Sequence, residues 1–285
     1  MDYNLCDYKT IEKLLRQYGF SFSKALGQNF IIDDGVCPAM AEALQADSET
    51  GVLEIGPGIG VLTKELCKTA GKVVAVELDR RLYPVLAETL GDYSNFTLAE
   101  GDVMKMDLAA LLREQFSGCR CIKVCANLPY YITSPVIMTL LESNLPLDEI
   151  VVMVQKEAAE RLCAAVGSRA AGAVSVAVQY YGESEILFEV GRECFLPSPK
   201  VDSAVIRITL RRKPHLHVDS EKAFFALVKA AFSQRRKTLV NALSGTMGIA
   251  KETLTAVLDA LSLPAGIRAE QLTMEDWVRL YEALH

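Results

Sequence analysis

The sequence predicts an α/β protein in which a doubly wound parallel sheet is followed by a smaller, all-helical domain. From Val52 onward, short apolar segments alternate with segments of helical periodicity, which is the order of βαβ units. A glycine-rich turn directly follows the first of these strands. After residue 213 the strand-like segments cease and only helical periodicity remains. We therefore predict one domain over residues 1–213 and a second over 214–285.

The expected elements of the first domain follow in order, without internal repeats. Residues 1–45 are expected to be helical and loop-like. Short apolar runs then indicate strands at 51–55, 72–77, 96–98, 122–125 and 149–155. Helices are expected at 60–69 and 79–90, and a further one with Ser134 as its N-cap and Pro135 as its first residue. Two later apolar segments are expected to complete the sheet as strands at 184–190 and 204–210.

The second domain is expected to consist of helices alone. Its helical periodicity covers 220–243, about 250–262 and 273–284, and the last helix opens with a capping-box pattern at Thr273. We place the boundary near 213, where the strand character ends in a basic segment followed by Pro214.

Composition favours a cytoplasmic protein with a full apolar core. Hydrophobic residues make up 51% of the chain, but no run of about 18 consecutive apolar residues occurs, so no membrane span is expected. The first residues carry acids and no apolar segment, so we expect no signal peptide. The eight cysteines include no CxxC pair and are expected to be reduced thiols. His215 and His217 lie far from any cysteine, so no metal site is expected.

Charge is distributed unevenly along the chain. The formal net charge is −6, which alone argues against a nucleic-acid partner. Residues 200–241, however, contain ten Lys and Arg against three acids. This segment is typical of a cationic face that binds a phosphate backbone, although a solvated helix face is the alternative explanation.

A glycine-rich turn and two acids suggest a nucleoside-containing ligand. The segment 54–60, EIGPGIG, joins a strand to a helix, and Gly56 and Gly58 allow a ligand to approach the backbone closely. Glu77 ends the second strand, where a carboxylate can accept both ribose hydroxyls. Asp102 follows the third strand, where it can accept a hydrogen bond from an adenine amino group. The GxGxG spacing favours S-adenosylmethionine over a nicotinamide dinucleotide in this Rossmann-like sheet.

The segment Asn127-Leu128-Pro129-Tyr130 directly follows the fourth strand and suggests chemistry on a nucleobase amine. The lone pair of such an amine is delocalised into the ring, so the amine is a poor nucleophile. The Asn127 side-chain oxygen and the Leu128 carbonyl can accept its two N–H groups and orient the lone pair towards a methyl donor. Tyr130 offers a stacking face for an extruded base.

Five segments together resemble the ribosomal RNA adenine dimethyltransferase family, and within it the branch that acts on the small subunit. They are KALGQNFIID (24–33), EIGPGIG (54–60), NLPYYITSP (127–135), FLPSPKVDSAV (195–205) and AFSQRRKTLVNAL (231–243). The resemblance extends from about Lys24 to near the C-terminus.

This resemblance implies the reaction and the residues that perform it. The reaction is transfer of methyl groups from S-adenosylmethionine to N6 of two adjacent adenosines in the 3′-terminal hairpin of 16S rRNA. The substrate is the small subunit or its precursor, and the enzyme is expected to be a monomer. The cofactor contacts implied are Asn29, Ile31, Gly56, Glu77, Asp102 and Asn127.

The resemblance also implies contacts with the RNA. Phe195 is expected to lie against the target adenine, opposite Tyr130, although an aromatic residue of the core is its other interpretation. Arg235, Arg236 and Lys237 are expected to contact the RNA backbone. Position 131 is Tyr, where some relatives have Asn, so a polar role of that side chain is not expected to transfer.

Four alternative functions remain open. A large-subunit rRNA dimethyltransferase that confers antibiotic resistance shares the fold and motif, but the long helical tail favours the small-subunit branch. A DNA adenine methyltransferase is expected to carry a larger target-recognition domain. A ribosome-assembly factor with secondary methylation would retain binding in catalytically dead variants. A nicotinamide-dependent dehydrogenase is disfavoured by the GxGxG spacing.

Overall fold

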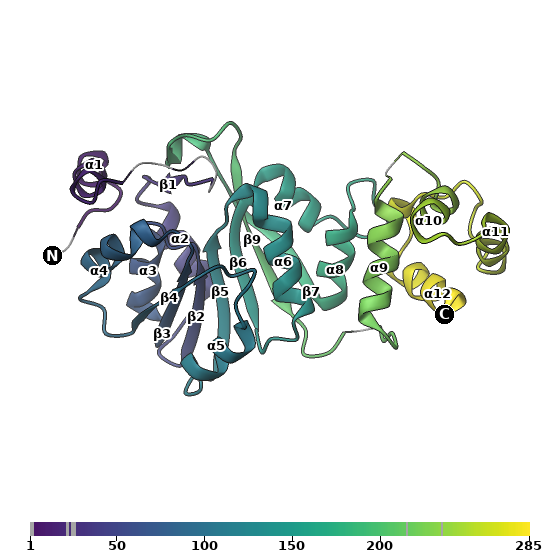
Figure 1. Cartoon of the computed structure of the whole chain (residues 1–285), viewed down its shortest axis with the longest axis horizontal. Helices are drawn as coiled ribbons and strands as arrows, with labels where there is room; N and C mark the ends of the chain where they lie inside the picture. Colours follow the sequence, from purple (N-terminus) through teal and green to yellow (C-terminus); the bar gives the residue numbers. More distant parts are fainter. Residues whose placement is uncertain (1–2, 21–22, 24–26, 215, 235) are drawn as a thin grey trace. The chain divides into compact units, whose positions relative to one another are not determined.

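The chain forms two compact units in the computed structural model, which describes residues 3–20, 23, 27–214, 216–234 and 236–285. Unit 1 comprises Met1–Ala159 and Glu185–Leu210, and unit 2 comprises Glu160–Ser184 and Arg211–His285 (Figure 1). The sequence predicts a boundary near 213, whereas the structure groups residues 160–184 with the C-terminal helices. The physical reason is that Tyr180, within residues 160–184, packs against Phe224 and Phe225 of the C-terminal region.

A seven-stranded sheet forms the centre of unit 1, with strand order β4-β3-β2-β5-β6-β9-β7 (Figure 1). Its strands are β2 (Thr50–Ile55), β3 (Lys72–Glu77), β4 (Phe96–Glu100), β5 (Cys121–Asn127), β6 (Glu149–Gln155), β7 (Gly182–Val190) and β9 (Ser203–Leu210). Strands β2 to β6 pair in parallel, which confirms the α/β prediction, and β9 pairs antiparallel with β6. The strand order reverses beside β2, where ligand sites of such sheets lie.

Helices of unit 1 bury their apolar sides against this sheet, except α1, whose buried residues pack in a cluster with Phe30 and with the apolar residues of α4. In sequence order they are α1 (Tyr8–Gln17), α2 (Val36–Leu44), α3 (Val61–Thr69), α4 (Tyr83–Leu90), α5 (Leu108–Gln115), α6 (Thr133–Glu142) and α7 (Lys156–Leu162), the last of which ends in unit 2. Met40 and Leu66 are fully buried in one cluster with Val52 and Val73. A second, two-stranded sheet pairs β1 (Phe30–Ile31) with β8 (Phe195–Leu196).

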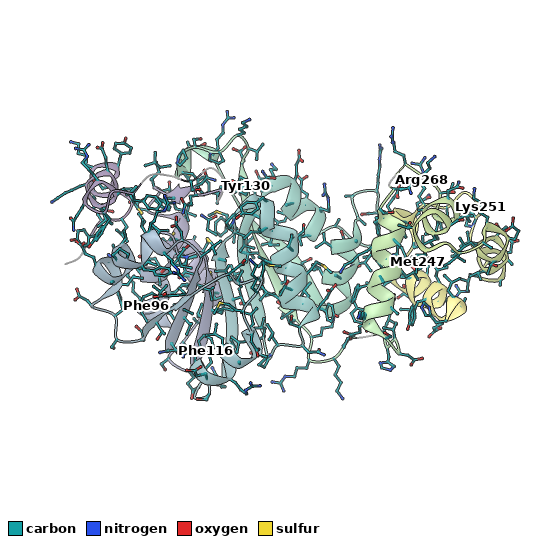
Figure 2. The ribbon with its side chains drawn as sticks, in the orientation of Figure 1. Phe96, Phe116, Tyr130, Met247, Lys251 and Arg268 are labelled. Carbon is teal, nitrogen blue, oxygen red and sulfur yellow. The ribbon has the colours of Figure 1, made fainter. Side chains whose placement is uncertain are left out.

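Close packing at the start of β2 depends on Gly51. A Cβ atom at this position would lie 2.4 Å from Cδ1 of Phe116, so any side chain would displace that ring. Phe116 follows α5 and is 2% exposed (Figure 2). The glycine therefore lets α5 pack directly against the sheet.

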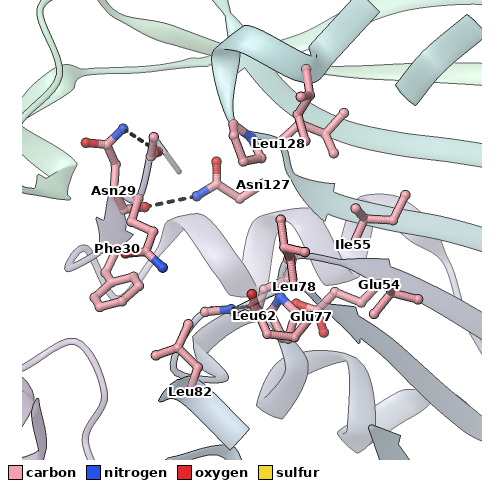
Figure 3. A pocket seen from close by; sticks show the side chains of 18 of the residues that line it. Asn29, Phe30, Glu54, Ile55, Leu62, Glu77, Leu78, Leu82, Asn127 and Leu128 are labelled. Atoms are coloured by element: carbon pink, nitrogen blue, oxygen red, sulfur yellow. Dashed lines mark hydrogen bonds between the residues drawn. The ribbon is translucent and has the colours of Figure 1, made fainter. Parts of the chain in front are cut away.

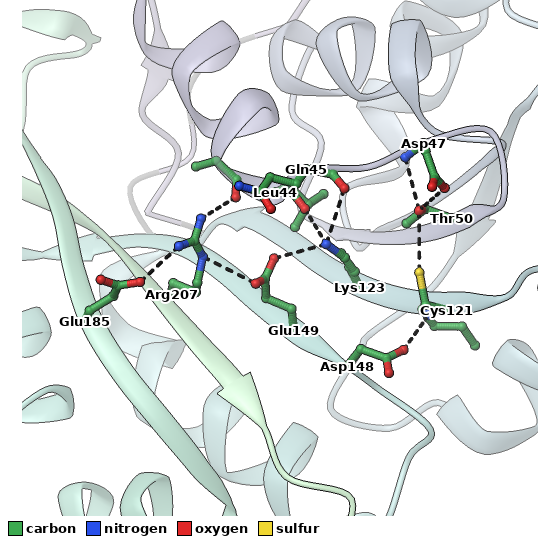
Figure 4. Close-up of polar contacts among 12 residues, drawn as sticks. Leu44, Gln45, Asp47, Thr50, Cys121, Lys123, Asp148, Glu149, Glu185 and Arg207 are labelled. Atoms are coloured by element: carbon green, nitrogen blue, oxygen red, sulfur yellow. Dashed lines mark hydrogen bonds and ion pairs between the residues drawn. The ribbon is translucent and has the colours of Figure 1, made fainter.

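Two cations of the sheet fix the C-terminal end of α2. Lys123 Nζ donates to the Leu44 carbonyl oxygen at 2.6 Å, and Arg207 Nη2 donates to the Ala43 carbonyl oxygen at 2.6 Å. Both side chains also pair with Glu149, at 3.4 and 3.3 Å (Figure 4). Because the last carbonyl groups of a helix lack partners within it, these donors stabilise α2 and its attachment to β5 and β9.

Unit 2 is helical, as the sequence predicts for the C-terminal region. It contains α8 (Ala173–Tyr181), α9 (Glu221–Phe232), α10 (Leu239–Met247), α11 (Lys251–Ala260) and α12 (Met274–Leu284). The ring of Tyr180 lies 5.5 Å from that of Phe224 and 5.4 Å from that of Phe225, measured between centroids. Tyr281 of α12 packs edge-on against Phe224 at 5.8 Å. Helix α8 thus belongs to the aromatic core of unit 2.

Two helix boundaries predicted from the sequence are wrong. Helix α6 begins at Thr133 and not after Ser134, because the 3₁₀ turn η3 (Tyr130–Ile132) leads directly into it. Pro135 is still tolerated, since N–H groups of the first turn have no partner within the helix. The expected helix over 220–243 is interrupted, and Thr238 caps the start of α10 through its side chain.

Among the described residues, no helix combines the length and the apolar character that crossing a bilayer requires.

Candidate active site

A pocket opens at the carboxyl ends of β2, β3 and β5, within unit 1 (Figure 3). The segments that line it are those in which the sequence predicted chemistry. They are residues 27–31, 54–59, 76–78, 101–103 and 127–132, together with Phe195, and the apolar side chains of Val61, Leu62 and Leu82 complete the lining. These segments, which are far apart in the sequence, thus line one pocket.

The glycine-rich turn leaves room in this pocket next to its backbone. Gly56 and Gly58 have φ angles of +71° and +61°, which glycine adopts without steric cost. Apart from its two chain neighbours, no described residue has an atom within 4 Å of where a Cβ of Gly56 would stand, whereas a Cβ of Gly58 would lie 3.2 Å from the Phe30 ring. The turn thus offers open space at Gly56 and close packing at Gly58, and it ends at the N-terminus of α3.

Glu77 is the last residue of β3 and points its carboxylate to the same turn. Its Oε1 accepts from the Asp79 backbone N–H at 2.7 Å, and its Oε2 accepts from the Gly58 N–H at 3.4 Å. Burial raises the pKa of Glu77, and these backbone hydrogen bonds oppose the rise. The carboxylate is therefore held rigidly at a strand end, as a ribose-binding acid must be.

Asp102 lies at the edge of the pocket and follows β4. Its Oδ1 accepts from the Met104 N–H at 3.0 Å, and its Oδ2 lies 3.5 Å from Lys105 Nζ. The backbone contact directs the carboxylate, while the lysine is largely exposed and contributes little to its position.

Asn127 ends β5 and faces β1 across the pocket. Its Nδ2 donates to the Asn29 carbonyl oxygen at 3.3 Å (Figure 3). This bond fixes the orientation of the amide group, and no donor from the described part of the chain reaches Oδ1, the acceptor of this side chain. The Leu128 N–H donates to the Met153 carbonyl oxygen of β6 at 3.1 Å, which fixes the peptide between Asn127 and Leu128. The Asn127 side chain and the Leu128 backbone N–H are thus held by two different parts of the structure, the segment before β1 and strand β6.

Two aromatic residues of the predicted base site lie at the pocket in different environments. Tyr130 is half-buried, and its hydroxyl lies 2.8 Å from Ser203 Oγ. Phe195 pairs with Ile31 in the β1–β8 sheet and is only 3% exposed, within an apolar cluster of the core. The structure therefore brings Phe195 to the pocket wall as a core aromatic residue. Tyr131, next to Tyr130, is 56% exposed at the pocket rim.

The segment around Asn29 is tied to the pocket by side chains that the sequence did not single out. Gln28 Nε2 donates to Asp79 Oδ2 at 2.9 Å, and Arg81 holds the same carboxylate at 2.6 Å. Asp79 lies two residues after Glu77, just beyond the end of β3. That position is the sequence signal that could have identified Asp79 as a residue near the pocket. Ile31 is buried beside Asn29, at 4% exposure.

A second missed residue is Glu54, which lines the pocket under the glycine-rich turn. It is 1% exposed, and its Oε2 has no hydrogen-bond partner in the described part of the chain. Burial raises the pKa of Glu54 to about 8. Its position at the start of the EIGPGIG segment was visible in the sequence, but its full burial was not.

The basic residues predicted to contact RNA lie in unit 2. Arg236 and Lys237 are exposed in the segment between α9 and α10. Arg235 lies outside the described residues.

Comparison with known proteins places these motifs in a family. The model of the family described as ribosomal RNA adenine dimethylase matches residues 19–285. The ribosomal RNA small subunit methyltransferase A of Bacillus pumilus is 45% identical over 276 residues, which cover 96% of this chain and 94% of the relative. The protein of the same name from Streptococcus sanguinis is 42% identical, with 98% of each chain covered.

Solved structures agree with this comparison. A dimethyladenosine transferase from Plasmodium falciparum has a TM-score of 0.71 and 25% identity, with 88% of this chain and 95% of that chain covered. The 23S rRNA methyltransferase ErmE has a TM-score of 0.65 and 26% identity, with 90% and 99% covered.

Proposed function

Because this chain belongs to the ribosomal RNA adenine dimethylase family, we propose that it methylates N6 of two adjacent adenosines in the 3′-terminal hairpin of 16S rRNA. The methyl donor is S-adenosylmethionine. The protein acts as a cytoplasmic monomer on the small subunit or its precursor. The observation that carries this proposal is the hydrogen bond from Asn127 Nδ2 to the Asn29 carbonyl oxygen, which fixes the orientation of the amide group and so the position of its acceptor, Oδ1, at the pocket.

The pocket residues fit the chemistry of S-adenosylmethionine. The open backbone at Gly56 accommodates the bulk of a ligand, and the fixed carboxylate of Glu77 suits a ribose. Asp102 is available for the adenine amino group, while Asn29 and Ile31 contribute the opposite wall. When bound, this cofactor supplies an electrophilic methyl group on a positively charged sulfur.

The chain contributes to transfer mainly by holding the target amine. Asn127 Oδ1 and the Leu128 carbonyl oxygen accept the two N6–H groups, which directs the lone pair towards the methyl group. Tyr130 stacks on the extruded adenine, and Phe195 supports the wall of the site behind it. Pro129 keeps the turn rigid between these groups. Such positioning can supply about 7–11 kcal/mol of the barrier.

No side chain has to act as a general base in this scheme. N6 gains one methyl group in each round as the methyl–sulfur bond breaks, which would leave S-adenosylhomocysteine with the electron pair on sulfur, and the proton that N6 loses passes to solvent after transfer. Two rounds at one adenine therefore give N6,N6-dimethyladenosine.

We further propose that unit 2 recognises the RNA backbone. Within this unit, residues 211–241 carry eight Lys and Arg against two acids, and Arg236 and Lys237 are exposed in that segment. Phosphate contacts release counterions, so binding should weaken steeply as salt increases. An affinity that stays constant from low to physiological salt would contradict this part of the proposal.

The test of the function is transfer of radiolabelled methyl groups to unmethylated small ribosomal subunits, with large subunits and duplex DNA as parallel substrates. We expect label as N6,N6-dimethyladenosine in the small-subunit RNA alone. Label in the large subunit would assign the chain to the other branch of the family. Cofactor binding without any transfer would indicate a binding factor in place of an enzyme.

A further inference from the structure

We propose that Ser203 is a positioning residue for methyl transfer: it fixes the ring of Tyr130 and so sets the plane on which the target adenine stacks. This inference rests on the proposed function, because it assigns a role within the same base site. The Tyr130 hydroxyl and Ser203 Oγ are 2.8 Å apart, within the normal range for hydroxyl groups.

Ser203 is a rigid point of attachment. It is fully buried, it begins β9, and it pairs with Gln155 of β6 in the antiparallel ladder. The preceding residue is held as well, since the Asp202 carbonyl oxygen accepts from the Lys156 N–H at 3.0 Å. Asp202 Oδ1 also accepts from the Arg192 N–H at 3.1 Å. The Cα of Ser203 is therefore fixed, and its short side chain retains rotation about a single torsion.

Tyr130 is held at its other end by the loop backbone. Two residues earlier, the Leu128 N–H donates to β6, and the Ile132 N–H donates to the Pro129 carbonyl oxygen at 3.1 Å. These bonds fix the Cα of Tyr130 but leave rotation about its side-chain torsions. The bond to Ser203 restrains that rotation at the tip of the ring.

The orientation of the ring matters because the adenine must satisfy two constraints together. Its amine has to reach Asn127 Oδ1, and its face has to lie on Tyr130. Both groups follow the same strand, so a rotated ring would tilt the base away from the acceptor. Loss of the restraint should therefore reduce the fraction of bound adenine that is aligned for transfer, and affect kcat more than cofactor binding.

The experiment is a double-mutant cycle with Ser203→Ala and Tyr130→Phe, each of which removes one partner of the bond. We measure kcat on small ribosomal subunits and the Kd of S-adenosylmethionine. Each single variant should lose about two- to tenfold in kcat, the range that one hydrogen bond supplies. The double variant should lose no more than the worse single variant, because the bond is already absent. The Kd of the cofactor should stay unchanged.

Two controls separate positioning from general stability. Ser203→Thr retains the hydroxyl and should recover most of the kcat. Ser175→Ala removes another buried serine hydroxyl, which donates to the Arg161 carbonyl oxygen at 2.5 Å within unit 2, and should leave kcat unchanged.

Three outcomes would overturn the inference: wild-type kcat in Ser203→Ala, additive losses in the double variant, or an equal loss in Ser175→Ala. Tyr130→Phe tests the same bond if Ser203→Ala fails to fold, and an unchanged kcat in that variant also overturns it. An inactive wild-type enzyme on small subunits would instead refute the proposed function.

Discussion

Replacing Glu54 with glutamine should change how the stability of unit 1 depends on pH. Glu54 is fully buried beneath the glycine-rich turn, with one carboxyl oxygen unpartnered. Burial disfavours the charged form, so the group is mostly protonated in the folded protein at neutral pH and ionised in the unfolded chain. Glutamine has nearly the same shape as the protonated acid but cannot ionise.

The size of the effect follows from the two pKa values. The pKa of Glu54 rises from 4.5 to about 8 on folding, so the folded protein binds more protons within this window. Stability contributed by the group is present below pH 4.5 and is lost as the pH rises towards 8. Between pH 4.5 and pH 7 the loss amounts to about 3 kcal/mol, at 1.36 kcal/mol for each pKa unit.

The assay has to report on unit 1 alone. The single tryptophan, Trp277, lies in unit 2, so its fluorescence would follow the wrong unit. Hydrogen exchange of the buried β2 amides in the cofactor-free protein, corrected for intrinsic rates, gives the free energy of opening. Wild-type protein should lose stability relative to Glu54→Gln from pH 5 to pH 7.5.

A matched control tests the charge itself. Glu114→Gln changes an exposed glutamate on α5 and should leave the wild-type pH profile unaltered. If the profiles of wild type and Glu54→Gln run parallel, the carboxyl of Glu54 is not neutral in the folded protein, and the reasoning from burial is refuted.

Four further variants test other parts of the structure. Asn127→Ala should abolish methyl transfer in a turnover assay but leave the Kd of the cofactor, measured by calorimetry, nearly unchanged. Methyl transfer at the wild-type rate would contradict the proposed role of Asn127. Glu77→Gln should weaken cofactor binding about tenfold or more, because a charged hydrogen-bond acceptor is lost; an unchanged Kd would exclude the ribose contact. Lys237→Ala should make the negative slope of log affinity against log salt concentration shallower by about 1, because one phosphate contact is lost. An unchanged slope would contradict this contact. Arg207→Met should cost about 1–3 kcal/mol in urea unfolding, because the end of α2 and Glu149 lose a donor; equal midpoints would contradict this.

The strands along the chain, the parallel α/β sheet and the strand ends that carry polar residues were predictable from the sequence. The short apolar runs indicated β2, β3, β5 and β6 because central parallel strands are buried on both faces, whereas β4 lies at the edge of the sheet and is only partly buried. The positions of Glu77, Asp102 and Asn127 at strand ends then placed them at one edge. These inferences needed only local patterns and the general geometry of α/β sheets.

Contacts between distant segments were not predictable in the same way. The bond from Tyr130 to Ser203 joins segments that no sequence period relates. Phe195 is hydrophobic in either role, so its burial depended on the pairing of β8 with β1. The break between α9 and α10 was hidden because residues on both sides continue an apolar helical pattern, and only Thr238 marked the new start.

The assignment of residues 160–184 to unit 2 has a consequence for the time at which that unit can form. The chain enters unit 2 at Glu160, leaves it at Glu185 and returns at Arg211. During synthesis, α8 emerges before α9, so Tyr180 has no aromatic partner until Phe224 and Phe225 have been made. Unit 2 therefore closes only late in translation, and a C-terminal fragment beginning at 214 would lack one of its helices and expose the aromatic surface that this helix covers.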